Sequence, residues 1–249
     1  MKQSDIKVGI IGYGVIGSTF SQWLKEHTQC RQAISDPPKG INEDLTDCNV
    51  FFIGIHIPTE SDGTQDLTLL KQIISNLPKA PVFIRTTLLP GTADMLTKEL
   101  NHPVYFMPEF LTERTAYADF CSQDVVISGE HELMDAIFAN KKRLYMSNIE
   151  AELTKYAHNV FGAVAVTYFN GIYDLCQKAG AEYEKVRQGL LLSGYIAPTH
   201  SHVPGPDGKF GYGGKCFPKD VNAFTEYSKG SPLFNLLESV INANKVFRN

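Results

Sequence analysis

One segment near the end of the chain places a cysteine, two lysines and an aspartate in a glycine-rich setting, GYGGKCFPKD at residues 211–220. Glycines leave a loop free to wrap a ligand and allow Cys216 to begin a helix, where the dipole favours a thiolate. Asp220 follows one helical turn later and can orient a water molecule or a proton. A lone cysteine is more often a small buried hydrophobe, but its glycine, lysine and aspartate neighbours favour a nucleophile.

A second glycine-rich string, Gly12-Tyr13-Gly14-Val15-Ile16-Gly17, lies between a predicted strand and a predicted helix. Such a turn admits a pyrophosphate to the N-terminus of the helix, where free N–H groups favour anions. Asp36 follows at the distance where a carboxylate can bond the ribose hydroxyls and repel a 2′-phosphate. The string predicts NAD rather than NADP; the alternative is a glycine turn that serves packing only. Thr59 ends another strand at the sheet edge where ligands bind.

Four further polar positions suit acid–base chemistry or oxyanion binding. Lys155 and Asn159 are four residues apart on a predicted helix, so they share a face that can hold an oxyanion, although this spacing alone is more typical of a solvated face. Glu109 follows a predicted strand and becomes a general base if it is partly buried; otherwise it is simply exposed. Thr87 also follows a strand and can place a hydroxyl over the cofactor.

The elements that must position these residues alternate in the first half of the chain. Runs that are apolar throughout predict strands covered on both faces, and the stretches between them have helical character. This βαβ rhythm predicts an open parallel sheet of Rossmann type. The predicted strands are 8–11, 50–55, 82–84, 104–106 and 125–127, and the predicted helices are 18–26, 67–77 and 92–100.

The pattern changes near residue 150. From Ile149 to Ala179 there is no proline and no strand signal, and apolar residues recur in steps of three and four, which predicts one long amphipathic helix. Gly180 suits its C-terminal end, and a last helix is predicted over 232–247. We therefore expect an NAD-binding domain at 1–148 and a helical central domain at 149–249.

Composition excludes several classes of protein. The 249 residues carry a formal net charge of −4 without a basic block, which argues against nucleic-acid binding. No apolar run reaches the roughly 18 residues of a membrane span, and the polar start shows no signal peptide. Five widely spaced cysteines without a CxxC pair suit neither a disulfide framework nor a metal site, so we expect no metal and a reducing, cytoplasmic setting.

Six strings, taken together and in order, resemble the UDP-glucose/GDP-mannose dehydrogenase family. They are GYGVIG, the IPT at 57–59, TTLLPGT, PEFLTE, AELTKYAHN and GYGGKCFPKD. The resemblance implies an NAD-dependent oxidoreductase that converts the primary alcohol of a nucleotide sugar into a carboxylate, a four-electron oxidation that consumes two NAD and serves polysaccharide biosynthesis. It also implies an α/β fold, with a Rossmann-like parallel sheet followed by an all-α central domain whose long helix forms a homodimer.

By the same resemblance, Cys216 attacks an intermediate aldehyde, and the resulting thiohemiacetal is oxidised to a thioester that water hydrolyses. The other implied catalytic residues are Lys155 and Asn159 at the oxyanion, Asp220 and Thr87 at a catalytic water, and Glu109 as a base. The implied cofactor residues are Gly12, Tyr13, Gly14, Val15, Ile16, Gly17, Asp36, Thr59 and Thr87. The implied substrate-binding residues are Phe110, Leu111, Lys155, Asn159, Phe210, Tyr212 and Gly213.

The chain also departs from the family pattern. Ser193 and Tyr195 stand where the family has the aspartate and arginine of Asp-x-Arg-Ile, so a planar cationic fork toward the substrate is lost. Arg85-Thr86 replaces a usual Lys-Ser, and Glu60 replaces a proline. The family's third, nucleotide-gripping domain is expected to be missing. This leaves open a non-catalytic NAD-binding module, or an enzyme of the β-hydroxyacid dehydrogenase kind, which needs no cysteine.

Overall fold

The structure is a computed structural model that describes residues 2–60 and 62–249. It divides the chain into two compact units. The first comprises residues 1–58 and 65–155, and the second comprises residues 59–64 and 156–249. Each unit is described by itself below.

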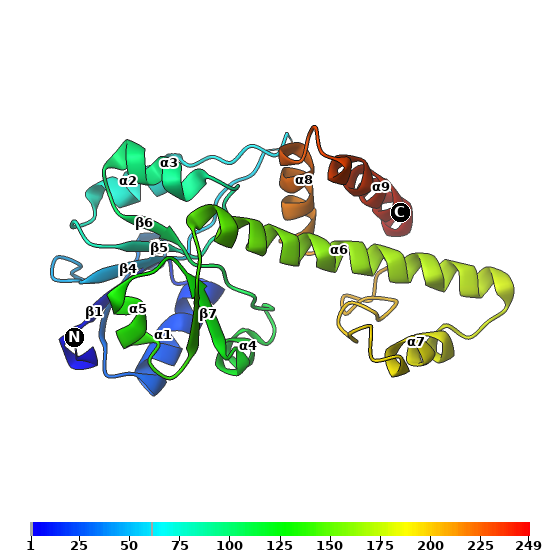
Figure 1. The fold of residues 1–249 in the computed structure, drawn as a ribbon, viewed down its shortest axis with the longest axis horizontal. Coiled ribbons are helices and arrows are strands. Elements are labelled where there is room, and N and C mark those ends of the chain that lie inside the picture. The colour runs from blue at the N-terminus through cyan, green and yellow to red at the C-terminus, as the bar shows by residue number, and fades with distance from the viewer. Residues whose placement is uncertain (1, 61) are drawn as a thin grey trace. The chain divides into compact units, whose positions relative to one another are not determined.

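The first unit contains a six-stranded sheet in the order β3-β2-β1-β4-β5-β6 (Figure 1). All neighbouring pairs run parallel except β2 and β3, so the sheet is the parallel sheet that the sequence predicts, with a short antiparallel edge added. The strands are β1 (Lys7–Ile11), β2 (Arg31–Asp36), β3 (Ile41–Asn42), β4 (Val50–Ile53), β5 (Val82–Ile84) and β6 (Val104–Phe106).

Helices cover both faces of this sheet. On one face, aromatic residues of α1 (Val15–His27) and α4 (Ala116–Ser122) and aliphatic residues of α5 (Glu132–Ile137) form a buried cluster with Phe52 and Phe83. On the other face, α2 (Thr68–Asn76) and α3 (Thr92–Leu100) pack on aliphatic side chains of β4 and β5. Two single turns of 3₁₀ helix, Gln3–Asp5 and Pro37–Lys39, complete the first part of the chain.

The strand predicted at 125–127 does not join the six-stranded sheet. It forms β7 (Val125–Ser128), which pairs in parallel with β8 (Lys142–Tyr145) in a separate two-stranded sheet. Sequence patterning gives no signal for β8 because its residues alternate between exposed and half-buried and begin with two cations. The crossover between the two strands contains α5, which is too short for a helical period to be visible.

The long helix is present as predicted, as α6 (Asn148–Ala179), and Gly180 with φ of +67° follows its end. Its first turns are anchored in the first unit, where Glu152 is fully buried and accepts hydrogen bonds from Gly91 N (2.6 Å) and Ala93 N (2.9 Å) at the start of α3. Burial raises the pKa of Glu152 to about 7, against the opposing effect of these two hydrogen bonds.

The second unit consists of helices joined by loops. It contains the rest of α6 together with α7 (Tyr183–Leu192), α8 (Phe217–Tyr227) and α9 (Pro232–Arg248). The loop at 193–216 connects α7 to α8. Tyr156 of α6 stacks on Phe224 of α8 with ring centroids 5.0 Å apart, which fixes α8 against the long helix. Across the described part of the chain, none of the helices is long and apolar enough to span a membrane.

Candidate cofactor and thiol sites

The first glycine-rich turn joins β1 to α1 and depends on glycine at two positions. Gly12 has φ of +86°, and a Cβ there would lie 2.7 Å from the carbonyl oxygen of Gly54. A Cβ on Gly17 would lie 1.9 Å from Gly12 O. Over Gly14, by contrast, a Cβ would meet no atom within 4 Å, and no side chain caps the start of α1. Open space over uncapped N–H groups fits a pyrophosphate.

Asp36 ends β2 beside this turn. Its Oδ2 accepts a hydrogen bond of 2.7 Å from Tyr13 N and lies 3.7 Å from Lys39 Nζ, while Lys39 also donates to Tyr13 O. These contacts hold the carboxylate at the edge of the glycine turn, where it fits the ribose hydroxyls of NAD.

Thr59, in the second unit, has a buried hydroxyl oxygen with no hydrogen-bond partner, so a ligand can satisfy it.

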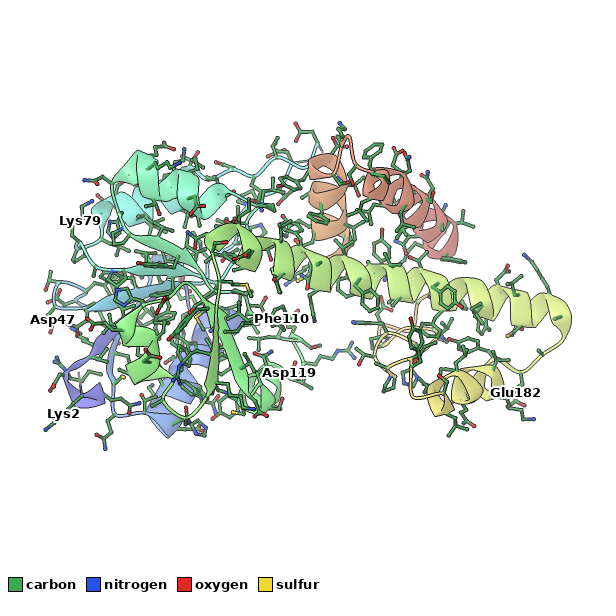
Figure 2. All side chains as sticks on the ribbon, viewed as in Figure 1. Lys2, Asp47, Lys79, Phe110, Asp119 and Glu182 are labelled. Carbon is green, nitrogen blue, oxygen red and sulfur yellow. The ribbon has the colours of Figure 1, made fainter. Side chains whose placement is uncertain are left out.

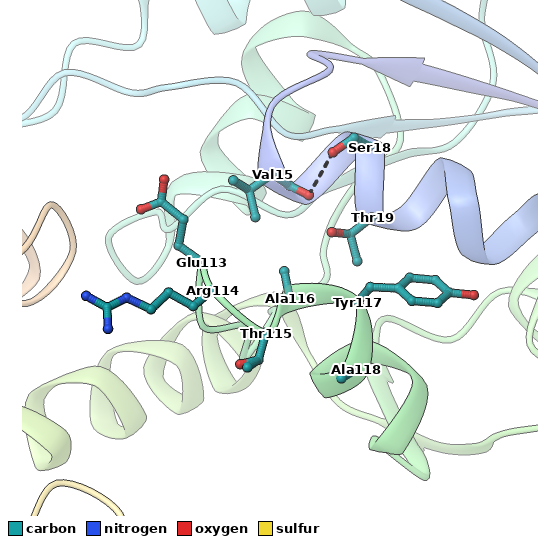
Figure 3. Close-up of a pocket in the computed structure, with 9 residues that line it drawn as sticks. All are labelled: Val15, Ser18, Thr19, Glu113, Arg114, Thr115, Ala116, Tyr117 and Ala118. Atoms are coloured by element: carbon teal, nitrogen blue, oxygen red, sulfur yellow. Dashed lines mark hydrogen bonds between the residues drawn. The ribbon is translucent and has the colours of Figure 1, made fainter. Parts of the chain in front are cut away.

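A surface pocket of about 540 Å³ borders the glycine turn. Val15, Ser18 and Thr19 of α1 line one wall, and the loop and first turn of α4 at 113–118 line the other (Figure 3). The side chains of Glu113 and Arg114 extend at one end of the pocket. Of these lining residues, sequence reasoning named only Val15, because the glycine pattern does not indicate which later loop lies beside it.

Lys155 and Glu109 form a buried ion pair in the first unit. Lys155 Nζ lies 2.9 Å from Glu109 Oε1, and the two side chains are 4% and 12% exposed. Glu109 Oε2 accepts from Leu111 N at 2.7 Å, and the Lys155 ammonium lies 5.6 Å from the ring centroid of Phe110, a residue labelled in Figure 2. Lys155 is therefore not on a solvated face, and four of the predicted residues meet here.

Arg85, noted from the sequence only as a replacement, is one of the largest fully buried side chains. Its guanidinium carbon lies 5.2 Å from the ring centroid of Phe20 and 5.0 Å from that of Phe120, and its Nε and Nη1 have no hydrogen-bond partner. Burial lowers the pKa of Arg85 to about 10, and the charge of Glu109 opposes this shift. Arg85 therefore adds a second cation near Glu109. Thr87, three residues after the end of β5, is also buried.

In the second unit, Asn159 of α6 contacts the first turn of α8. Asn159 Nδ2 donates to Asp220 Oδ2 at 2.7 Å, Lys219 Nζ lies 2.6 Å from Asp220 Oδ1, and Asp220 is fully buried. Cys216 is the N-cap of α8, is exposed, and its carbonyl oxygen accepts from Asp220 N at 2.9 Å. The predicted helix start at Cys216 is confirmed, and the carboxylate one turn later is buried and paired.

The loop before Cys216 is held by side chains from two helices. Gly211 N donates to Asn170 Oδ1 (2.9 Å), and Tyr212 N donates to Asn244 Oδ1 (2.7 Å). Arg248 Nε donates to Tyr212 O at 2.9 Å, and its guanidinium also binds Asp207. Sequence reasoning missed Asn170, Asn244 and Arg248, because a polar residue on a helix carries no sign of the distant loop it binds.

The remaining cysteines are not part of this arrangement. Cys48 and Cys176 are buried, Cys30 is half-buried and Cys121 is exposed on α4. Burial raises the pKa of Cys48 to about 11, which makes its thiol unreactive at neutral pH. In the described part of the chain, no group of three or more His, Cys, Asp or Glu side chains has the arrangement of a metal site.

Comparison with known proteins places both parts of the chain in one family. Residues 38–149 match the NAD binding domain of the UDP-glucose/GDP-mannose dehydrogenase family, and residues 149–246 match its central domain. The UDP-glucose 6-dehydrogenase of Pseudomonas aeruginosa is 34% identical over 207 residues, which are 73% of this chain and 45% of that protein. The UDP-glucose 6-dehydrogenase YwqF of Bacillus subtilis is 30% identical over 221 residues, 80% of this chain and 49% of that protein. The chain thus spans about half the length of the curated relatives it matches.

Solved structures share the fold. A UDP-glucose dehydrogenase from the archaeon Pyrobaculum islandicum superposes with a TM-score of 0.83 at 21% identity, covering 97% of this chain and 68% of that one. A GDP-mannose dehydrogenase from Pseudomonas aeruginosa superposes with a TM-score of 0.65 at 20% identity, covering 96% and 68%. The Rossmann-like sheet followed by a long helix and a helical unit is therefore a fold found in nucleotide-sugar dehydrogenases.

Proposed function

Because the chain belongs to the UDP-glucose/GDP-mannose dehydrogenase family and its first unit contains that family's NAD binding domain, we propose that it oxidises the primary alcohol of a nucleotide sugar to the uronate. The observation that carries the proposal is the second unit's buried Asn159–Asp220 pair, which lies at the first turn of the helix that begins with Cys216.

In the proposed reaction, the sulfur of Cys216 forms a bond to the aldehyde carbon made by the first oxidation, which gives a thiohemiacetal. Loss of a hydride from that carbon and of the proton from its hydroxyl oxygen gives a thioester, and water then releases the carboxylate and restores the thiol. NAD, when bound, accepts the hydride of each oxidation, which requires two NAD per substrate. The exposure of Cys216 and its position at a helix start support a thiolate that is accessible to the substrate.

The polar residues have separate proposed roles. Lys155 and Asn159, one turn apart on α6, stabilise the oxyanion of the thiohemiacetal, because an ammonium and an amide N–H both favour negative oxygen. Asp220 and Thr87 orient the attacking water. Glu109, which is 12% exposed and paired with Lys155, accepts a proton from that water during thioester hydrolysis.

The proposed binding residues form two groups, one for the cofactor and one for the substrate. The turn at 12–17, with Asp36 and Thr59, holds NAD. Phe110 and Leu111 of the first unit, and the loop of Phe210, Tyr212 and Gly213 in the second, contact the nucleotide sugar. The hydrogen bonds that fix this loop support a preformed binding surface.

A homodimer through the long helix is part of the proposal. Three large apolar side chains of α6 recur at seven-residue spacing, and Phe161, Tyr168 and Leu175 are 71%, 54% and 60% exposed. Such a stripe suits a helix partner, since seven residues are two helical turns. Phe161→Glu is expected to lower the mass measured by sedimentation from dimer to monomer; a monomeric wild type would contradict this part.

The test of the reaction counts NADH per molecule of substrate for UDP-glucose, GDP-mannose and UDP-N-acetyl sugars. The wild type is expected to make two NADH per sugar, and Cys216→Ala is expected to make no carboxylate while it still binds NAD in calorimetry. Full turnover by Cys216→Ala would contradict the covalent route. The match of residues 38–149 to an NAD binding domain also supports a second candidate, a non-catalytic NAD-binding module, for which NAD binds and no sugar yields NADH.

A further inference from the structure

The pocket beside the glycine turn of residues 12–17 has one wall that belongs to α4. This pocket wall, residues 113–118, consists of a loop and the first turn of α4, and it lies across the pocket from the first turns of α1 (Figure 3). α4 has only seven residues, and isolated helices shorter than roughly 12 residues are marginal in water. The position of the pocket wall must therefore be set by contacts of α4 with the rest of the first unit.

The loop in the pocket wall is bonded to α4 itself. Asp119 Oδ2 accepts hydrogen bonds from Thr112 N at 2.7 Å and from Thr115 Oγ1 at 3.0 Å. Since Asp119 is a helix residue and the two donors precede the helix, these bonds join the loop to α4. A shift or tilt of α4 consequently displaces the pocket wall with it.

The ammonium group of Lys141 binds the other end of α4. Lys141 Nζ donates to Phe120 O at 2.9 Å and to Cys121 O at 3.3 Å, and it also donates to Gln123 O. The last carbonyl groups of a helix have no partner within the helix, and the helix dipole favours a cation beside them. Lys141 is only 9% exposed, so these hydrogen bonds compete little with water.

Lys141 also contacts the aromatic residues that pack α4 on α1. Its Nζ lies 5.4 Å from the ring centroid of Phe120 in α4 and 5.8 Å from that of Trp23 in α1. The rings of Trp23 and Phe120 meet edge to face, with centroids 5.4 Å apart, and the buried Arg85 approaches Phe120 to 5.0 Å. A cation gains most from an aromatic face when water is excluded. Lys141 therefore holds together the two helices that border the pocket.

The backbone of Lys141 is fixed independently of α4. Lys141 N donates to Phe138 O at 2.9 Å, and Arg143 Nη1 donates to Lys141 O at 2.6 Å and to Phe138 O at 2.8 Å. These bonds anchor the lysine in the turn that precedes β8. Lys141 can thus support α4 from a fixed point.

We propose that Lys141 is a positioning residue for NAD binding, because it sets the distance between the pocket wall and the glycine turn of residues 12–17. Lys141 is not one of the residues that line the pocket, so it acts through α4. The inference rests on the proposed binding of NAD at this turn. A preformed pocket binds its ligand with a smaller loss of entropy, so removal of this support should weaken NAD binding.

The experiment measures the Kd of NAD by calorimetry in the whole chain. Lys141→Met keeps an unbranched side chain without the ammonium group and is expected to raise the Kd about 5- to 10-fold. Lys141→Gln keeps an N–H donor without the charge and is expected to raise the Kd about 2- to 4-fold. Lys142→Met removes the same charge at the exposed next position and is expected to leave the Kd unchanged.

Two further measurements separate positioning from a general loss of stability. Ile74→Val in α2 removes one buried carbon on the other face of the sheet, and it is expected to destabilise the chain without changing the Kd. Trp23 is the single tryptophan of the chain, so its fluorescence reports the contact between α1 and α4. Its emission is expected to change in Lys141→Met and not in Lys142→Met.

An unchanged Kd in both folded Lys141 variants would overturn the inference, as would an equal rise in Lys142→Met or Ile74→Val. If the wild type makes two NADH per sugar and both Lys141 variants bind NAD normally, the proposed reaction stands and the positioning role is wrong. If no sugar yields NADH but the Lys141 variants bind NAD more weakly, the positioning role stands and the reaction is wrong. A wild type that binds no NAD would contradict both.

Discussion

The two glycine-rich turns of the molecule are built in opposite ways. In the turn at 12–17, backbone packs on backbone, because the missing Cβ atoms of Gly12 and Gly17 would collide with carbonyl oxygens. In the loop at 211–214, backbone packs on side-chain ends. A Cβ on Gly211 would lie 2.4 Å from Asn244 Oδ1, and one on Gly213 would lie 1.8 Å from Arg248 Nη2. The first turn is fixed by backbone contacts within the turn and with Gly54, whereas the second depends on side chains of α6 and α9.

Gly17→Ala is expected to give the largest effect, a loss of about 3 kcal/mol or more in the free energy of unfolding. The new methyl group would lie 1.9 Å from a backbone oxygen that cannot move without disturbing β1. Urea unfolding followed by circular dichroism measures the loss. Gly14→Ala is the matched control, since nothing lies within 4 Å of its Cβ, and it is expected to cost less than about 1 kcal/mol. Equal costs at the two positions would contradict the backbone collision.

A pH dependence is expected from Tyr212 in the second loop. Burial raises the pKa of Tyr212 to about 12, above the value near 10 of an unfolded chain. The unfolded chain therefore loses its proton first, and stability falls by up to about 2–3 kcal/mol between pH 10 and 12. Tyr212→Phe is expected to flatten this slope in urea unfolding, whereas a parallel slope would show that Tyr212 ionises freely. Tyr183 titrates in the same range and contributes equally to both proteins.

Asn244→Ala is expected to cost about 2 kcal/mol, because the amide is bonded to both Tyr212 N and Tyr212 O and its loss leaves them unpaired. Hydrogen exchange at Tyr212 N is expected to accelerate in the same variant. Asn242→Ala, at an exposed position of the same helix, is the control and is expected to change stability by less than about 0.5 kcal/mol. If Asn242→Ala lowered stability as much as Asn244→Ala, the loss would be due to helix propensity and not to the bonds with Tyr212.

Gly213→Ala is expected to be the mildest change, at about 1 kcal/mol or less. Although its Cβ would lie closer to another atom than that of Gly17, the atom is the end of a flexible arginine that can swing aside. A double-mutant cycle with Arg248→Met checks this, since the cost of Gly213→Ala should then fall toward zero. A cost as large as that of Gly17→Ala would remove the distinction between the two turns.

The same contrast explains what the sequence could predict. The strand–glycine–helix turn, the long helix and its end at Gly180 are local, so neighbouring residues predict them. The helix start at Cys216 was also visible. The burial of Arg85 between Phe20 and Phe120 was not, because cation–π packing in a core leaves no periodic trace. Nor was the close packing at Gly162, where a Cβ would lie 2.7 Å from Phe217 Cζ and 3.1 Å from His200 Nε2.

The buried carboxyl of Glu152 at the start of α6 has a consequence for calorimetry. With its pKa raised to about 7, this group holds a proton in the folded chain at mildly acidic pH and releases it when the chain unfolds, because a free glutamate is then ionised. The buffer takes up that proton. The heat of unfolding near pH 6 should accordingly differ between phosphate and imidazole solutions by the difference in their ionisation enthalpies.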